Sequence, residues 1–130
     1  MLKSEDIVIE SGRDKGKKFK ITEMPATKMD KWATKALLIL GKQGTAFNLA
    51  QLDLEELLRG LSNADYAGVE PLLEELLSCA SFERDGVSMT MTSSIADGII
   101  EDWTTLFRLR IEALKLNLGF LEQGDGSTED

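Results

Sequence analysis

The segment from Ile95 to Leu121, IADGIIEDWTTLFRLRIEALKLNLGFL, constrains the fold most, because it predicts one long helix with more apolar surface than a small domain covers. At about 100° per residue, its apolar side chains fill an arc of roughly 220° around the helix axis. An ordinary surface helix needs about half of that arc. One side of this helix can pack on the domain's own core, and the other side needs a second layer of the chain or another protein.

Two apolar lines run along the predicted helix, and polar side chains occupy the remaining arc. We expect one line to pack on the chain's own core, and its members are Ile99, Trp103, Phe107, Ile111, Leu114 and Leu118. We expect the other line to face further copies of the chain or an apolar client, and its members are Leu109, Leu116 and Phe120. The polar arc, expected to face solvent, contains Glu101, Thr104, Thr105, Arg108, Glu112, Lys115 and Gly119. For Trp103, core packing is the simpler interpretation and an interface anchor is the alternative.

Length and composition indicate one globular domain. With 130 residues, 42% of them apolar and 29% charged, the chain can bury a core without covalent or metal cross-links. We assign residues 1–121 to this domain and expect residues 122–130, which are small, polar and acidic, to form a disordered tail. No apolar run approaches the roughly eighteen residues of a membrane span, and the N-terminus lacks the apolar core of a secretory signal. We therefore expect a cytoplasmic protein that does not bind membranes.

The residue types that are missing from the chain exclude much chemistry. There is no histidine and one cysteine, Cys79, so Ser-His-Asp and Cys-His catalytic sites, histidine zinc ligands and internal disulfides are impossible. Adjacent acidic pairs on the predicted helices point about 100° apart, so they do not form a facing acid and base. We expect no enzyme activity, no cofactor and no metal site.

Charge is distributed unevenly along the chain, whose formal net charge is −8. Residues 1–42 contain ten Lys or Arg against six acids, and residues 43–130 contain five against seventeen. The simplest interpretation is a solvated exterior. The alternative is docking between one basic and one acidic surface, including head-to-tail self-association.

Alternating apolar and polar residues predict two short β-hairpins. The first hairpin pairs residues 7–11 with residues 17–22, across a turn bounded by two glycines. The second covers residues 82–92 and turns at Asp85-Gly86, a strong two-residue turn signal.

Helical periodicity predicts three helices before the long one, over residues 26–40, 49–60 and 63–80. Pro71 is expected to open the better half of the third helix, because proline fits a first turn. Ser93 or Ser94 is the expected N-cap of the long helix. Together the patterns predict a single α+β domain, mostly helical, with two short hairpins and a long C-terminal helix.

The tip of the first hairpin, GRDKGKK over residues 12–18, has two glycines and a lysine like a phosphate-binding loop. The glycines are one residue too close for such a loop, and Lys18 stands where a hydroxyl should meet magnesium, so a turn is the preferred interpretation. The basic side chains of the tip are candidate partner contacts, namely Arg13, Lys15, Lys17 and Lys18. A lone basic hairpin on an acidic chain without stacking aromatics does not predict nucleic-acid binding.

The chain resembles the tail assembly chaperones of lambda-like long-tailed phages (siphophages and prophages). The resemblance covers most of the chain in order, through the segments IVIESGRDKGKKFKIT, MPATKMDKWATKALL, VEPLLEELLSCASF and TLFRLRIEALKLNLGFL. It implies a nonenzymatic role in the cytoplasm of the infected host. There, such proteins bind and solubilise the tape measure protein, assist the tail tube protein to polymerise around it, and are absent from the mature virion.

In many of these phages a ribosomal frameshift also makes a longer form that recruits tube subunits, and this chain resembles the short, unshifted product. The residues expected to contact the tape measure protein or further copies in a homo-oligomer are Trp103, Leu109, Leu116 and Phe120, together with Arg13, Lys15, Lys17 and Lys18. The alternative is a structural tail or head completion protein that stays in the virion. A small acidic regulator that contacts nucleic acid through the hairpin is a third interpretation.

Overall fold

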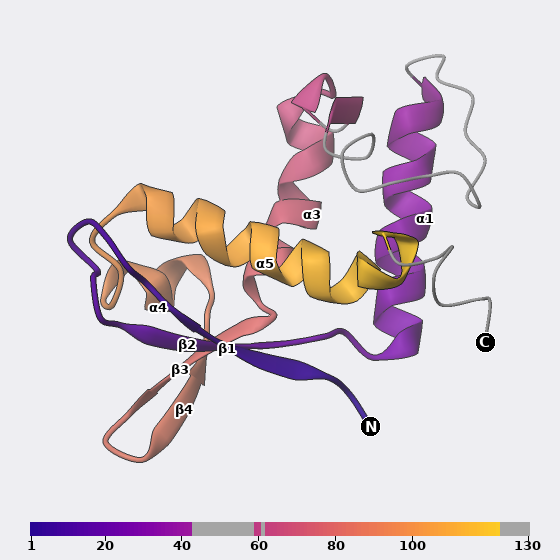
Figure 1. The fold of residues 1–130 in the computed structure, drawn as a ribbon. Helices are drawn as coiled ribbons and strands as arrows, with labels where there is room; N and C mark the ends of the chain where they lie inside the picture. Colours follow the sequence, from indigo (N-terminus) through magenta and orange to yellow (C-terminus); the bar gives the residue numbers. More distant parts are fainter. Residues whose placement is uncertain (43–58, 61, 123–130) are drawn as a thin grey trace.

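Two antiparallel hairpins join into one four-stranded sheet that helices cover on one side (Figure 1). This computed structural model describes residues 1–42, 59–60 and 62–122. Helix α5 crosses above the sheet and contacts both β2 and α3, while α1 and α3 stand side by side (Figure 1). The elements are β1 (Ser4–Val8), β2 (Lys18–Thr22), α1 (Ala26–Lys42), α3 (Tyr66–Leu77), β3 (Ala80–Arg84), β4 (Val87–Thr90), α4 (Ser93–Asp97) and α5 (Trp103–Glu122).

The α+β class is confirmed, but the expectation of a mostly helical chain is too strong. Helices account for 51% of the chain, because the two hairpins and their connections use much of the rest. Side chains of α5 are described for its first 16 residues, as far as Leu118.

Both predicted hairpins are present in the structure, but β1 covers Ser4–Val8 and so lies three residues earlier than the predicted strand over residues 7–11. Strands β1 and β2 pair from Ser4↔Thr22 to Val8↔Lys18, and β3 pairs with β4 around Asp85 and Gly86. Asp85 has φ 54° and Gly86 has φ 80°, as expected for a two-residue turn that needs positive φ at both positions.

No pattern in the sequence indicates that the two hairpins pair with each other. Strand β2 pairs with β3 through Lys20↔Ser81 and Ile21↔Ala80, which makes the strand order β1-β2-β3-β4. Ile21 and Ala80 are fully buried at this junction. Local alternation of residues carries no information about pairing between strands this far apart in the chain.

Helices α1 and α3 pack against each other beside the sheet. Helix α1 begins at Ala26 as predicted, and the indole N–H of Trp32 on α1 donates to the Leu72 carbonyl on α3 at 3.1 Å. The helix expected over residues 49–60 lies outside the described residues, apart from Arg59 and Gly60.

Pro71 was expected to open the better half of the helix over residues 63–80, but it lies inside one continuous helix, α3. The helix begins five residues earlier, at Tyr66. Val69, in the turn before the proline, is buried, so packing holds that turn helical although Pro71 cannot donate a backbone hydrogen bond.

The prediction of one helix from Ile95 to Leu121 is wrong, because the segment breaks into α4 and α5. Thr92, rather than Ser93 or Ser94, caps α4 by accepting from the Ile95 N–H at 3.3 Å. Gly98 ends α4, and Ile99 and Ile100 then turn into the core. Burial of these two isoleucines is the physical reason for the break.

A buried line on α5 attaches this helix to the rest of the domain. It consists of residues four apart, namely Thr105, Leu109, Ala113 and Asn117. The amide oxygen of Asn117 accepts from the Met24 N–H at 2.7 Å, and its nitrogen donates to the Ala113 carbonyl at 2.8 Å. Asn117 therefore fixes α5 to the connection between β2 and α1.

Asn117→Ala should lower the free energy of unfolding by about 2 to 3 kcal/mol, because it leaves the buried Met24 N–H without an acceptor. Lys115→Ala is the matched control on the exposed side of the same helix and should change stability by less than about 0.5 kcal/mol. Urea unfolding followed by tryptophan fluorescence measures both. Equal stability of the two variants would contradict the structural role of Asn117.

Candidate functional site

Helix α5 presents an apolar stripe to solvent, formed by Trp103, Phe107 and Ile111, which we call the Trp103 stripe. Their exposed fractions are 66%, 56% and 38%. The Trp103 and Phe107 rings meet edge to face with centroids 5.4 Å apart, and the Arg110 guanidinium lies 5.3 Å from the Phe107 centroid. Side chains four residues apart on a helix form one continuous surface, so the stripe is a single contact area.

This stripe reverses the expected division of the helix into faces. We assigned Trp103, Phe107 and Ile111 to the core and Leu109 and Leu116 to a free surface, but Leu109 is fully buried and Leu116 packs half-buried against the core. The reason is the rotation of α5 about its axis: Thr105, which we placed in the solvent arc, is 2% exposed.

Other members of the expected faces have mixed outcomes. Ile99, Leu114 and Leu118 are buried as expected. The side chain of Phe120 lies outside the described part of the chain. Because Leu109 is inaccessible, we do not carry it forward as a contact residue, whereas Trp103 remains a candidate as the interface anchor.

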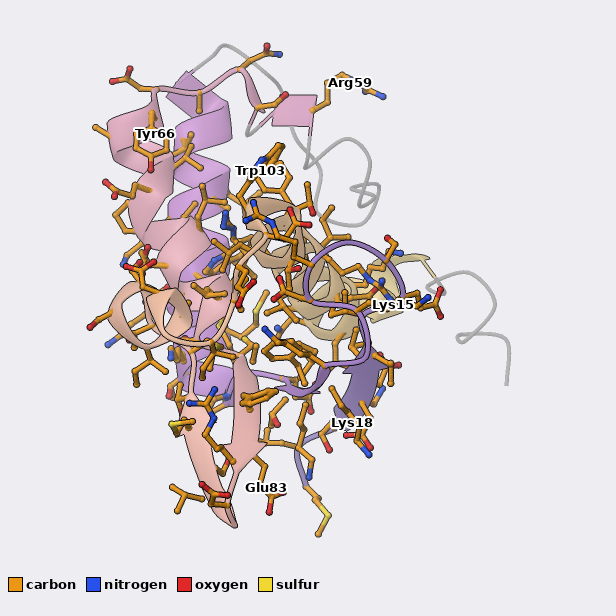
Figure 2. The ribbon with its side chains drawn as sticks, turned by 90° about the vertical axis from the view of Figure 1, so that its left-hand side faces the viewer. Lys15, Lys18, Arg59, Tyr66, Glu83 and Trp103 are labelled. Carbon is orange, nitrogen blue, oxygen red and sulfur yellow. The ribbon has the colours of Figure 1, made fainter. Side chains whose placement is uncertain are left out.

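The basic residues of the hairpin tip do not form one free cluster. The Lys17 ammonium lies 2.7 Å from an Asp14 carboxylate oxygen and donates to the Ile99 carbonyl at 2.6 Å. Lys18 lies 3.8 Å from the Asp6 carboxylate on the neighbouring strand. Arg13 and Lys15 are exposed, and Figure 2 shows Lys15 and Lys18 on the side of the molecule away from Tyr66. Lys17 is therefore a structural residue.

The Asp14 carboxylate is the centre of a buried polar network that sequence reasoning missed. Asp14 is fully buried. It accepts from the Lys17 ammonium at 2.7 Å, the Thr105 hydroxyl at 2.7 Å, and the backbone N–H groups of Glu101 and Asp102, each at 3.0 Å. The sequence offers one local sign, an Asp three residues before a Lys, and no sign of the partners about 90 residues away.

The electrostatics of this network keep Asp14 ionised. Burial raises the pKa of Asp14, but the hydrogen bonds from Lys17, Glu101, Thr105 and Asp102 together outweigh that effect. The pKa therefore lies well below the ordinary value of 3.8. A carboxylate that accepts these bonds next to the start of α5 also interacts favourably with the positive end of the helix dipole.

Asp102 completes the junction between the hairpin tip and α5. Its carboxylate accepts from the Arg13 backbone N–H at 3.3 Å and from the Thr104 hydroxyl at 3.0 Å. The Thr104 and Arg13 hydrogen bonds lower the pKa of Asp102. Trp103 follows directly, so the same junction positions the first residue of the Trp103 stripe.

A metal site in the described part of the chain would use its acidic side chains and its one thiol. Within residues 1–42, 59–60 and 62–122, no group of three or more His, Cys, Asp or Glu side chains is arranged to hold a metal ion. Burial raises the pKa of Cys79, and its sulfur contacts the Asn117 amide at 3.6 Å. No helix among the described residues is both long and apolar enough to span a membrane.

Comparison with known proteins decides the family. A family model described as "Phage tail assembly chaperone protein, TAC" matches residues 15–127, most of the chain. The chain belongs to the phage tail assembly chaperones. No match is found among curated proteins, and none among solved structures. The matched range begins directly after Asp14 and includes Lys17 and Thr105, two of the residues that bond Asp14 in this chaperone.

Asp14→Asn should lower the free energy of unfolding of this chaperone by about 2 to 4 kcal/mol near pH 7, because it removes the charge that Lys17 and the backbone donors neutralise. Since the folded pKa is below the unfolded value of 3.8, the stabilisation is present above that value and is lost as pH falls below it. Urea unfolding between pH 7 and pH 2 should show that the free energies of unfolding of the wild type and of Asp14→Asn approach each other at low pH. Asp30→Asn, at an exposed position on α1, is the control. A stability difference between Asp14→Asn and the wild type that does not change with pH would show that an ionised Asp14 does not stabilise the fold.

Two glycines in the hairpin tip allow the energetic cost of backbone strain to be measured separately from the cost of a steric contact. Gly12 and Gly16 both have positive φ, but a Cβ on Gly12 would lie 2.5 Å from an Asp102 carboxylate oxygen, whereas a Cβ on Gly16 meets open space. Gly16→Ala should cost about 1 kcal/mol from backbone strain alone. Gly12→Ala should cost at least about 1 kcal/mol more in the same urea measurement; equal costs would show that the Asp102 contact is not tight.

Proposed function

We propose that this chain is a nonenzymatic tail assembly chaperone that binds the tape measure protein through the Trp103 stripe and keeps it soluble while tail tube proteins polymerise around it. The family match supports the role in tail assembly. The observation that carries the choice of surface is the exposure of Trp103 and Phe107, two large aromatic side chains that pack on each other in water. Adjacent exposed aromatics of this kind are typical anchors of protein interfaces.

The geometry of the stripe fits a helical partner. Trp103 to Ile111 covers nine residues, and the eight rises of 1.5 Å between them give about 12 Å along the helix axis. That length matches about two turns of an apposed amphipathic helix, the form that the family resemblance implies for the long tape measure protein. Arg110 lies over the stripe and favours acidic residues beside the partner's apolar face.

One such contact is weak, because three side chains bury little area. A long client offers many similar segments, so several copies of the chaperone on one client would gain strength through multivalency. The proposal therefore includes a homo-oligomeric or clustered state on the client. It also places the protein in the host cytoplasm and outside the mature virion, with contact to the tail tube protein made by a longer, frameshifted form.

Coexpression with the tape measure protein tests the surface. Trp103→Ser combined with Phe107→Ser should reduce the soluble tape measure protein at least about tenfold, because it removes most of the apolar contact area. Leu38→Ser combined with Tyr66→Ser is the matched control: these side chains are 65% and 66% exposed but lie on α1 and α3. Both variants should keep the wild-type unfolding temperature, since all four positions are exposed. An unchanged yield of soluble client with the Trp103 and Phe107 variant would overturn the proposed surface.

Mass spectrometry of purified virions tests the class of protein. A chaperone should be missing from particles that contain the tape measure and tube proteins. Recovery of this chain in fixed proportion to the tube protein would instead support a structural completion protein that stays in the virion.

A further inference from the structure

Among the strands that the structure describes, β4 lies at an edge of the sheet. It lies last in the order β1-β2-β3-β4, on the β3–β4 hairpin that projects away from the helices (Figure 1). The Met91 N–H donates to the Ala80 carbonyl at 2.9 Å, and in an antiparallel ladder hydrogen-bonded pairs alternate with non-bonded pairs. The backbone groups of Met89 and Val87 therefore point toward β3, and those of Ser88 and Thr90 point outward. Both outward residues are exposed.

Strand β4 lacks the charges that protect most sheet edges. Its sequence is VSMT, whereas the opposite edge, β1, carries Glu5 and Asp6. Charged residues, proline or bulges usually keep an edge strand from pairing with another strand. The neutral edge also carries Val87, an apolar side chain that is 59% exposed.

We propose that β4 pairs antiparallel with β4 of a second copy of this chain, so that two sheets join across a twofold axis. The register follows from the outward backbone groups: Ser88 bonds with Thr90 of the second copy, and Thr90 with its Ser88. This places Met89 opposite the second copy's Met89, on the axis, as a non-bonded pair. It also places each Val87 opposite the second copy's Met91.

Pairing of β4 with β4 of a second copy is more favourable than any pairing that involves β1. The register that bonds Ser88 to Thr90 repeats itself under twofold rotation, so one strand satisfies the other without a second kind of surface. Pairing of β1 with itself would bring the carboxylates of Asp6 together. Pairing of β1 with β4 would bring Glu5 and Asp6 toward the hairpin that carries Glu83 and Asp85. Because the strand has four residues, the dimer should be weak and concentration-dependent.

A charge-exchange experiment tests the pairing. Ser88→Lys combined with Thr90→Lys places four lysines around the axis and should raise the dissociation constant of the dimer at least about tenfold in analytical ultracentrifugation. Ser88→Glu combined with Thr90→Glu should do the same. An equimolar mixture of the two variants should associate again, as heterodimers. Lysines introduced at Ser4 and Asp6 on the β1 edge are the control and should leave association unchanged.

A cysteine experiment tests the register, in the full chain with Cys79→Ser so that no other thiol is present. Met89→Cys should form a disulfide-linked dimer under copper-phenanthroline oxidation, because non-bonded antiparallel partners have Cα atoms about 4.5 Å apart. Val87→Cys should not, because the two copies of that residue are offset by four positions, roughly 13 Å along the strand. Crosslinking of Val87→Cys alone would overturn the register.

Three results would overturn the proposal as a whole: a wild-type chain that stays monomeric up to about 1 mM, dimers that persist in the lysine variant, or a mixture that fails to associate. The inference is independent of client binding. The β4 variants leave the Trp103 stripe intact, and the Trp103 and Phe107 variant leaves β4 intact, so each proposal can fail alone.

Discussion

The structure depends on one buried ionic interaction, the Asp14 carboxylate with its four donors. A charge without water is costly unless it is paired and hydrogen-bonded, and Asp14 finds its partners in three places: the hairpin tip, the connection after α4, and the first turn of α5. The tip is polar and rich in glycine, so these segments meet through polar contacts, and the hydrogen bonds from Arg13 to Asp102 and from Lys17 to Ile99 add to those of Asp14. The network therefore holds the tip of the first hairpin against the start of α5.

The same network explains how α5 can expose aromatic side chains on a stable helix. Thr105 bonds Asp14 at one end of the buried line, and Asn117 bonds the Met24 N–H at the other. Two polar anchors twelve residues apart fix the rotation of the helix, so the Trp103 stripe is held outward before any partner arrives. A surface that is already in its binding geometry loses less conformational entropy on association.

Local features of this fold could be predicted from the sequence, and features that depend on rotation or distant pairing could not. The Asp85-Gly86 turn follows from the backbone preferences of its two residues, and the start of α1 at Ala26 follows from the helical spacing of its apolar residues. Periodicity also predicts the width of the apolar arc on α5, but it does not predict which part of that arc faces the core. The polar hydroxyl of Thr105 predicts a position that faces solvent, but its hydrogen-bond partner Asp14 lies 91 positions away in the chain. The β2–β3 pairing and the break after Gly98 rest on similarly distant contacts.

The separation between Asp14 and its partners has a consequence for the order in which the chain acquires its structure. During synthesis the hairpin tip leaves the ribosome early, but Glu101, Asp102 and Thr105 follow only 87 to 91 residues later. Until then the carboxylate remains hydrated, and closing so long a loop is among the slower steps of folding. The N-terminal hairpin and α5 thus reach their final arrangement together, and the Trp103 stripe has its fixed orientation only after α5 has been translated.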